Sequence, residues 1–165
     1  MSLPVTVKRL GIRAAYRALQ VVWLVTRPRK QGVKCVLTDR DRVLLVRHSY
    51  GCRDWDLPGG AIKRGEAPRH AARREMDEEL GVRPPHWVPL GSVAGRNDHR
   101  RDTIHVFGAQ VGEGPLRLDL GELLTAGWFQ RDELPEVRPL AAHVLRHTLG
   151  RAIDAAAHRP ARRAA

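Results

Sequence analysis

Three glutamates, Glu75, Glu78 and Glu79, stand close together in a segment with helical character. On an α-helix their side chains fall within about 100° of one another, beside an apolar stripe that includes Met76 and Leu80. Like charges at this spacing repel each other, so something must offset them. Neighbouring arginines could do so, but a hard divalent cation would do so better, because Mg²⁺ sites combine carboxylates with substrate phosphates. On this evidence alone, a solvated acidic helix face is an equal alternative.

The residues on both sides extend these glutamates into a longer pattern with defined spacing. The pattern is a glycine, five residues, a glutamate, seven residues, Arg-Glu, an apolar residue, any residue, Glu-Glu, any residue, a glycine and an apolar residue. In this chain the defined positions are Gly60, Glu66, Arg74, Glu75, Met76, Glu78, Glu79, Gly81 and Val82. Seven defined identities at about one in fifteen each arise by chance with a probability on the order of 10⁻⁸. This segment resembles the complete signature of the Nudix hydrolase family, and with its flanking strands the resemblance extends over residues 33–150.

The resemblance implies an α/β fold, a Nudix-like α/β/α sandwich with a mixed β-sheet. It also implies hydrolysis of a pyrophosphate bond in a nucleoside diphosphate linked to another moiety, with Mg²⁺ or Mn²⁺ as the cofactor. By position, Glu75, Glu78 and Glu79 resemble the catalytic and metal-ligating residues, with Gly60 at the metal site as well. Glu78 is a further metal ligand or a candidate for the general base.

The same resemblance assigns a structural role to two residues. Glu66 and Arg74 resemble the ion pair that holds the loop of the signature against its helix. Gly60 and Gly81 would allow tight backbone geometry at the two ends of the segment.

The chemistry of the expected reaction agrees with these residue types. Divalent ions neutralise a pyrophosphate and lower the pKa of a bound water, and a nearby glutamate can accept the remaining proton. We therefore expect a metal-activated water to attack phosphorus, without a covalent enzyme intermediate. The alternative is a nucleotide- or RNA-binding regulatory Nudix domain with little turnover. Because the signature glutamates are all present, the sequence favours the enzyme.

Five residues outside the signature are candidates for substrate binding. His48 and Trp55 precede it, and Trp55 could stack on a base, although a core aromatic is the more common role. Arg96 and Arg100 lie in an Arg- and His-rich loop that could hold a phosphate. Glu122 lies where many Nudix proteins have another carboxylate near the metals. The alternative for Arg96 and Arg100 is that they lie in a solvated turn. The alternative for Glu122 is that it is an ordinary loop residue.

The substrate itself is not determined by the sequence. The marks typical of Nudix enzymes that act on ADP-ribose, diadenosine polyphosphates, NADH and coenzyme A are absent from this chain. Nucleoside triphosphates, nucleotide sugars and capped or triphosphorylated RNA stay open. The expected partner is therefore a small nucleotide or nucleotide-linked molecule, with an RNA 5′ end as an open alternative.

Periodicity and turn residues place these side chains on short strands and two helices. A hairpin of strands at 35–38 and 43–48, a short strand at 55–57 and a helix at 68–80 are expected first. Two strands at 87–94 and 103–111 follow, joined by a loop at 96–102. A short apolar stretch at 128–129 leads to a last helix at 139–156.

The N-terminal segment has a different composition from the rest of the chain. Residues 1–34 contain eight basic residues and no acidic one, and a basic amphipathic helix is expected at 8–25. We therefore predict a helical extension at 1–32, a Nudix domain at 33–156 and an Ala/Arg-rich tail at 157–165. Packing of the helix on the domain is favoured over contact with nucleic acid or with a membrane surface.

Composition excludes several other classes of protein. The chain has 165 residues and a net charge of +11, with excess basic residues near both ends and none within the signature. Since the chain contains no run of about 18 apolar residues, we expect no transmembrane segment. Cys35 and Cys52 show no metal-binding spacing, and together with the lack of a secretory signal they favour a cytoplasmic location. The oligomeric state stays open, a homodimer included.

Overall fold

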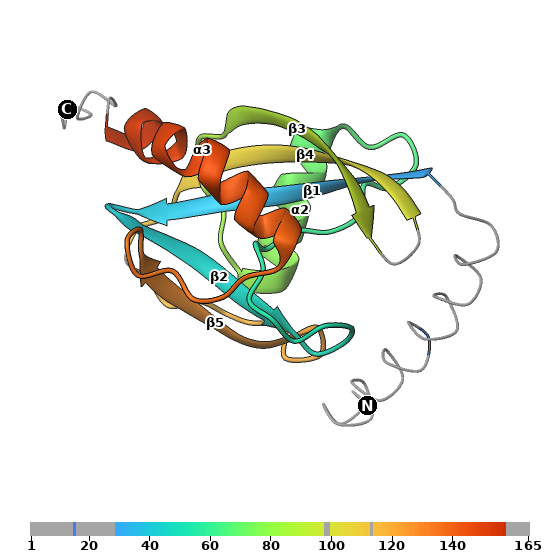
Figure 1. Cartoon of the computed structure of the whole chain (residues 1–165), viewed down its shortest axis with the longest axis horizontal. Coiled ribbons are helices and arrows are strands. Elements are labelled where there is room, and N and C mark those ends of the chain that lie inside the picture. The colour runs from blue at the N-terminus through green and yellow to red at the C-terminus, as the bar shows by residue number, and fades with distance from the viewer. Residues whose placement is uncertain (1–14, 16–28, 98–99, 113, 158–165) are drawn as a thin grey trace.

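One mixed β-sheet with a helix on each face positions the candidate residues (Figure 1). The computed structural model describes Ala15 and residues 29–97, 100–112 and 114–157. The five strands have the order β3-β4-β1-β2-β5, in which β1 and β4 are parallel and the other neighbours are antiparallel. In chain order the elements are β1 (Arg29–Asp39), β2 (Arg42–His48), α2 (Pro68–Leu80), β3 (Val88–Asn97), β4 (Arg100–Gln110), β5 (Leu123–Gln130) and α3 (Pro139–Ala157).

Alternate residues of the central strands point to opposite faces of the sheet and build two apolar cores. On one face, the buried side chains of Cys35 and Leu44 belong to the same core as Met76 of α2. On the other face, Val36 belongs to a core that includes Val144 of α3. Figure 1 shows α3 in front of the sheet and α2 behind it. The predicted α/β fold, with helices covering both faces of a mixed sheet, is confirmed.

The loop that precedes α2 is built into the sheet. β1 and β2 pair directly at their hairpin end, and further along residues 55–62 lie between the two strands. The N–H of Val33 in β1 donates to the carbonyl of Gly60 at 2.9 Å, and Val46 in β2 exchanges two backbone hydrogen bonds with Asp56. These bonds hold the loop against the centre of the sheet, next to α2.

Helix α2 begins and ends where the sequence predicts. Pro68 lies in the first turn, where its missing N–H removes no intrahelical hydrogen bond. Gly81 ends the helix with a left-handed φ of 67°, and its N–H donates to the carbonyl of Asp77 at 3.1 Å. Met76 and Leu80 are fully buried on the sheet side. This orientation brings the neighbouring glutamates to the edge of the buried face.

Several strands are longer than the sequence pattern indicates. The first begins at Arg29, and the strands on either side of the expected loop at 96–102 extend to Asn97 and from Arg100, so most of that loop is strand. Only an apolar stretch was expected at 128–129, but the structure forms strand β5 there. Most residues of β5 are half-buried, so neither face of this strand is fully buried or fully exposed. Its sequence therefore lacks the alternation of polar and apolar residues from which a strand is predicted.

Other expectations concern parts of the chain that the structure does not describe. The predicted helix at 8–25 lies outside the described residues except for Ala15, and the tail lies outside them beyond Ala157. The predicted domain boundaries therefore stay predictions. Among the described residues, no helix is both long and apolar enough to cross a membrane.

Candidate active site

A pocket of about 450 Å³ opens beside α2. Its walls come from the loop before the helix, from one side of the helix and from two loops that flank β2 and β5. The lining residues are Tyr50, Gly59, Gly60, Ala61, Lys63, Arg74, Glu75, Glu78, Glu79, Asp119 and Glu122. The structure thus brings together Gly60, all three glutamates of the predicted metal site, and Glu122.

Glu79 lies at the bottom of this arrangement and is 3% exposed. One carboxylate oxygen accepts a hydrogen bond from the N–H of Gly59 at 3.2 Å, and no ion pair to Glu79 occurs within the described residues. Burial, and then the charge of Glu75, raise the pKa of Glu79 to about 8. Near neutral pH this carboxyl therefore holds a proton unless a cation stabilises its charged form.

Glu75 packs directly against the loop that precedes the helix. A Cβ atom on Gly60 would lie 2.5 Å from the carboxyl carbon of Glu75, so only glycine leaves room for this side chain. Burial also raises the pKa of Glu75. The carbonyl of Gly60 already accepts the N–H of Val33, which leaves one lone pair for another partner.

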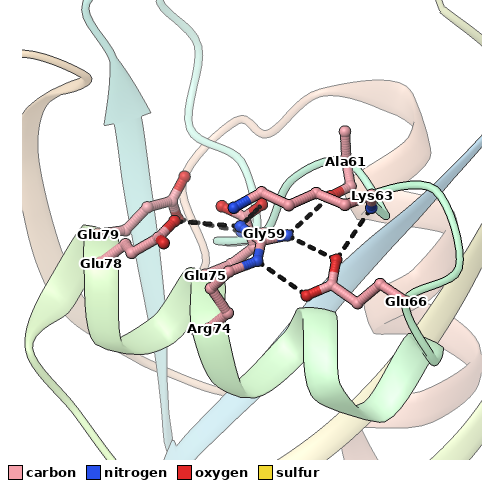
Figure 2. A network of polar contacts seen from close by, with 8 residues as sticks. All are labelled: Gly59, Ala61, Lys63, Glu66, Arg74, Glu75, Glu78 and Glu79. Atoms are coloured by element: carbon pink, nitrogen blue, oxygen red, sulfur yellow. Dashed lines mark hydrogen bonds and ion pairs between the residues drawn. The ribbon is translucent and has the colours of Figure 1, made fainter.

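Arg74 connects the loop to three glutamates (Figure 2). Its Nε and Nη2 bond both carboxylate oxygens of Glu66, at 2.8 and 2.9 Å, and Nη2 also donates to the carbonyl of Ala61 at 3.0 Å. Its Nη1 donates to Glu75 at 2.7 Å and to Glu78 at 3.0 Å. These five bonds use all the N–H donors of a guanidinium group.

Glu66 belongs to the frame of the loop and not to the pocket lining. In addition to the two bonds from Arg74, it accepts the backbone N–H of Lys63 at 2.9 Å. The hydrogen bonds from Arg74, followed by that from Lys63, lower the pKa of Glu66 to about 2. Glu66 is therefore a charged structural partner throughout the physiological range.

The opposite wall of the pocket is formed by two connected loops. The N–H of Ser49 donates to the carbonyl of Glu122 at 2.7 Å, and the Ser49 hydroxyl donates to the carbonyl of Gly121 at 2.6 Å. The N–H of Asp119 donates to the carbonyl of Glu79 at 2.9 Å. These bonds hold Tyr50, Asp119 and Glu122 across from α2.

Two predicted substrate-binding residues lie outside the pocket lining. His48 is buried, with its ring 5.4 Å from that of Tyr50, and burial lowers the pKa of His48 to about 4. Trp55 meets Phe129 edge to face at 4.7 Å and packs against the core under α3. The structure therefore does not bring Trp55 or His48 together with the glutamates.

Arg96 and Arg100 lie on neighbouring strands. Arg96 pairs with Arg101 and Asn97 pairs with Arg100 in the antiparallel β3–β4 ladder. Their side chains are outside the description, so their role in substrate binding stays a prediction.

Lys63 is a polar lining residue that was not among the candidates drawn from the sequence, and Tyr50 and Asp119 line the pocket as well. Lys63 lies inside the signature, between Gly60 and Glu66, at a position where the signature accepts any residue. Its place in the loop was the available signal, because this loop must bend over the helix to bring Glu66 to Arg74. The position of Asp119 depends on contacts between distant segments, which the spacing of residues does not reveal.

The donor set of the pocket suits a hard divalent cation. Carboxylate oxygens are the ligands that Mg²⁺ and Mn²⁺ prefer, and a buried carboxyl without an ion pair gains most from a cation. In the described part of the chain, no three His, Cys, Asp or Glu side chains converge on one ion position. The bonds from Arg74 to Glu75 and Glu78 explain this arrangement, because they direct those two carboxylates towards the guanidinium.

Comparison with known proteins gives the same assignment as the geometry. The family model for the NUDIX domain matches residues 28–148, which include the whole sheet, α2 and the pocket. This chain belongs to the NUDIX domain family. The assignment to the Nudix hydrolases made from the signature is thereby confirmed, and residues 60–82 are its Nudix box.

Curated relatives match parts of this chain. An RNA pyrophosphohydrolase from Rhodospirillum rubrum is 41% identical over 69 residues, which are 41% of this chain and 41% of that protein. An ADP-ribose pyrophosphatase from Mycobacterium tuberculosis is 33% identical over 95 residues, which are 53% of this chain and 44% of that protein. The chain thus spans less than half the length of these two relatives.

Solved structures of Nudix proteins share the fold. A MutT Nudix hydrolase from Burkholderia pseudomallei superposes with a TM-score of 0.68 at 24% identity, over 73% of this chain and 98% of that chain. The NUDIX domain of NrtR from Shewanella oneidensis, solved with ADP ribose, superposes with a TM-score of 0.65 at 18% identity, over 79% of this chain and 97% of that chain. At these identities the likeness establishes the fold alone.

Proposed function

We propose that this Nudix protein hydrolyses a pyrophosphate bond in a nucleoside diphosphate linked to another group, with Mg²⁺ or Mn²⁺ held by Glu75, Glu78 and Glu79. The observation that carries this proposal is Glu79, a carboxyl group that is 3% exposed, has no ion pair within the described residues and lines a pocket with three further glutamates. A purely structural carboxylate at that depth would be expected to have a cationic partner.

The burial of each glutamate indicates the role that we assign to it in metal binding or proton transfer. Glu79 is buried and Glu75 is half-buried, and these two provide the inner oxygen ligands. The Glu78 side chain is 56% exposed and provides an outer ligand or accepts a proton. When bound, the cation would neutralise phosphate charge and lower the pKa of a coordinated water. Binding would require Glu75 and Glu78 to turn from Arg74, which keeps its two bonds to Glu66 and so holds the loop in place.

Glu122 contributes from the opposite wall. Its charge raises the pKa of Glu79, which places the two carboxyl groups close enough to interact electrostatically. We assign Glu122 to the metal or the proton-transfer side of the same pocket. The predicted cytoplasmic location accords with the nucleotide substrates of such an enzyme.

The test is a hydrolysis screen with Mg²⁺ and with Mn²⁺ over nucleoside triphosphates, nucleotide sugars, dinucleotides, ADP-ribose and 5′-triphosphorylated RNA. We expect metal-dependent release of a nucleoside monophosphate, pyrophosphate or phosphate from at least one class, and its loss in Glu79→Gln. Absence of hydrolysis across the whole panel would contradict the proposal. Nucleotide binding in that case would support a regulatory Nudix domain instead.

A further inference from the structure

Lys63 occupies a position in the pocket that the proposed chemistry does not yet use. It lies in the loop between Gly60 and Glu66, where its backbone N–H donates to Glu66 at 2.9 Å and its carbonyl accepts the N–H of Glu66 at 3.0 Å. These two bonds fix the backbone at Lys63. Figure 2 shows its side chain running back across the loop towards Gly59 and Glu75, and the residue is exposed to solvent at the mouth of the pocket that it lines.

The cations of the pocket differ in what they already bind. Among the described residues, two basic ones line it, Lys63 and Arg74, against five acidic ones. Arg74 has every N–H donor engaged by the loop and the glutamates. The ammonium of Lys63 makes no hydrogen bond or ion pair within the described residues. It is therefore available to an anionic ligand.

Lys63 lies on the loop before α2, whereas the other walls of the pocket are rich in acidic residues: α2 contributes three glutamates beside Arg74, and the loops across from α2 contribute two more carboxylates. The wall across from the loop of Lys63 provides the acidic side chains of Asp119 and Glu122, together with Tyr50, and these lining residues include no cation. A phosphate that is not held by the proposed metal ions is repelled from that wall and attracted to Lys63. A terminal phosphate carries a charge of about −1.5 to −2 near neutral pH, whereas a phosphate esterified on both sides carries −1, so the attraction is larger for a terminal phosphate.

We propose that Lys63 binds the ionised terminal phosphate of the substrate, and so makes the enzyme select polyphosphates with a free end over diphosphates esterified at both ends. This inference rests on the proposed function, because it takes the cluster of glutamates as the site of hydrolysis. It places nucleoside triphosphates and 5′-triphosphorylated RNA ahead of ADP-ribose and nucleotide sugars. Lys63 is then a specificity-determining residue and takes no part in the proton transfers.

The test compares Lys63→Ala with Lys63→Arg and with a matched control, Arg64→Ala. The control removes the same charge from the next residue, which is exposed and does not line the pocket. For a nucleoside triphosphate, we expect Lys63→Ala to raise KM on the order of tenfold, as loss of a hydrogen bond to a charged group does, while kcat stays within about twofold. For ADP-ribose, KM should change by less than about threefold, and Lys63→Arg should restore most of the loss.

A binding measurement separates this inference from the proposed function. Calorimetry with a nucleoside triphosphate whose bridging oxygens are replaced by methylene groups does not depend on turnover. We expect its Kd to rise on the order of tenfold in Lys63→Ala and to stay unchanged in Arg64→Ala. An unchanged Kd in Lys63→Ala, an equal rise in the control, or an equal loss for ADP-ribose would overturn the role of Lys63. A wild-type protein that binds the analogue through Lys63 but hydrolyses nothing would overturn the proposed function alone.

Discussion

Asp56 and Glu79 are each 3% exposed, yet the surrounding residues shift their pKa values in opposite directions. Asp56 lies 2.9 Å from the ammonium of Lys34 and 3.5 Å from the guanidinium of Arg138, and these cations lower its pKa despite its burial. Glu79 has no such partner within the described residues, and its pKa rises to about 8. Equal burial therefore has different consequences, depending on whether a cation is supplied by the chain.

The comparison separates a structural carboxylate from the one that we propose to be functional. The contacts of Asp56 tie together β1, the segment before the Nudix box and the residue that precedes α3. No cation within the described residues pairs with Glu79, which lies at the wall of a pocket large enough for a ligand. Ionising such a group without a cationic partner costs stability, and we therefore propose that Glu79 serves to bind a cation from solution.

The largest effect is expected from removing the charge of Glu79. Glu79→Gln keeps the shape of the side chain and the acceptor for the Gly59 N–H, but it removes the proposed innermost ligand. We expect kcat to fall on the order of 10²- to 10³-fold, measured by product release with Mg²⁺, while the circular dichroism spectrum is unchanged. Asp77→Asn on the same helix, whose partner is the exposed Arg83, is the control and should keep full activity.

The reciprocal change at Asp56 should affect stability and not chemistry. Asp56→Asn leaves Lys34 with a side chain that is 13% exposed and without its charged partner. Removing one member of such a buried pair costs about 3–5 kcal/mol, which urea unfolding would measure. Asp77→Asn again serves as the control, with little change expected at a surface pair. A fully stable Asp56→Asn variant would show that this pair does not have the structural role assigned to it.

The two carboxyl groups should also give stability profiles of opposite slope. Because the pKa of Glu79 is higher in the folded protein than its ordinary value of 4.5, its contribution to stability is greatest at acidic pH and is lost as the pH rises to about 8. The slope for one such group is at most about 1.4 kcal/mol per pH unit. Asp56 has a lowered pKa, so its contribution is complete above pH 3.8 and is lost on acidification below it.

Urea unfolding without divalent ions, between pH 5 and pH 8, isolates the term from Glu79. Relative to Glu79→Gln, the wild-type protein should lose stability as the pH rises over this range, because the shifted groups Glu75 and His48 titrate in both proteins and their contributions cancel in the difference. Parallel profiles for the two proteins would mean that Glu79 does not titrate abnormally in the fold.

A smaller loss of activity is expected when the inner ligand Glu75 is displaced but not removed. In Gly60→Ala the new methyl group would lie 2.5–2.6 Å from the carboxyl atoms of Glu75, so that side chain must move. We expect activity to fall on the order of tenfold, with the metal concentration for half-maximal activity raised. Gly65→Ala is not a suitable control, since Gly65 has a φ of 78° and the change adds backbone strain. Gly114→Ala is suitable, because its surroundings are open.

Sequence reasoning located the helix of the site well because its signals are local. Pro68, Gly81 and the apolar stripe of Met76 and Leu80 define α2 without reference to the rest of the chain. The Nudix box then relates Arg74 to the loop before the helix. Both features depend on spacing within about twenty residues, which the sequence displays directly.

The remaining parts of the site depend on contacts between distant segments. Trp55 was a reasonable candidate for base stacking, but Gly127 on β5 leaves room for it to pack beside Phe129. The pairing of Asp56 with Lys34 spans 22 residues, and nothing local indicates it. The direction of the Lys63 side chain likewise follows from the folded loop, not from the residue type.

The most direct test of the role of Glu79 is the change in thermal unfolding temperature on adding Mg²⁺ at pH 7.5, without substrate. We expect Mg²⁺ to stabilise the wild-type protein, because an ion that binds only the folded state raises its stability. The same rise should occur in Asp56→Asn, from a lower starting temperature, and should be largely absent in Glu79→Gln. An equal Mg²⁺-dependent rise in Glu79→Gln and wild type would contradict the assignment of this buried carboxyl group as the cation site.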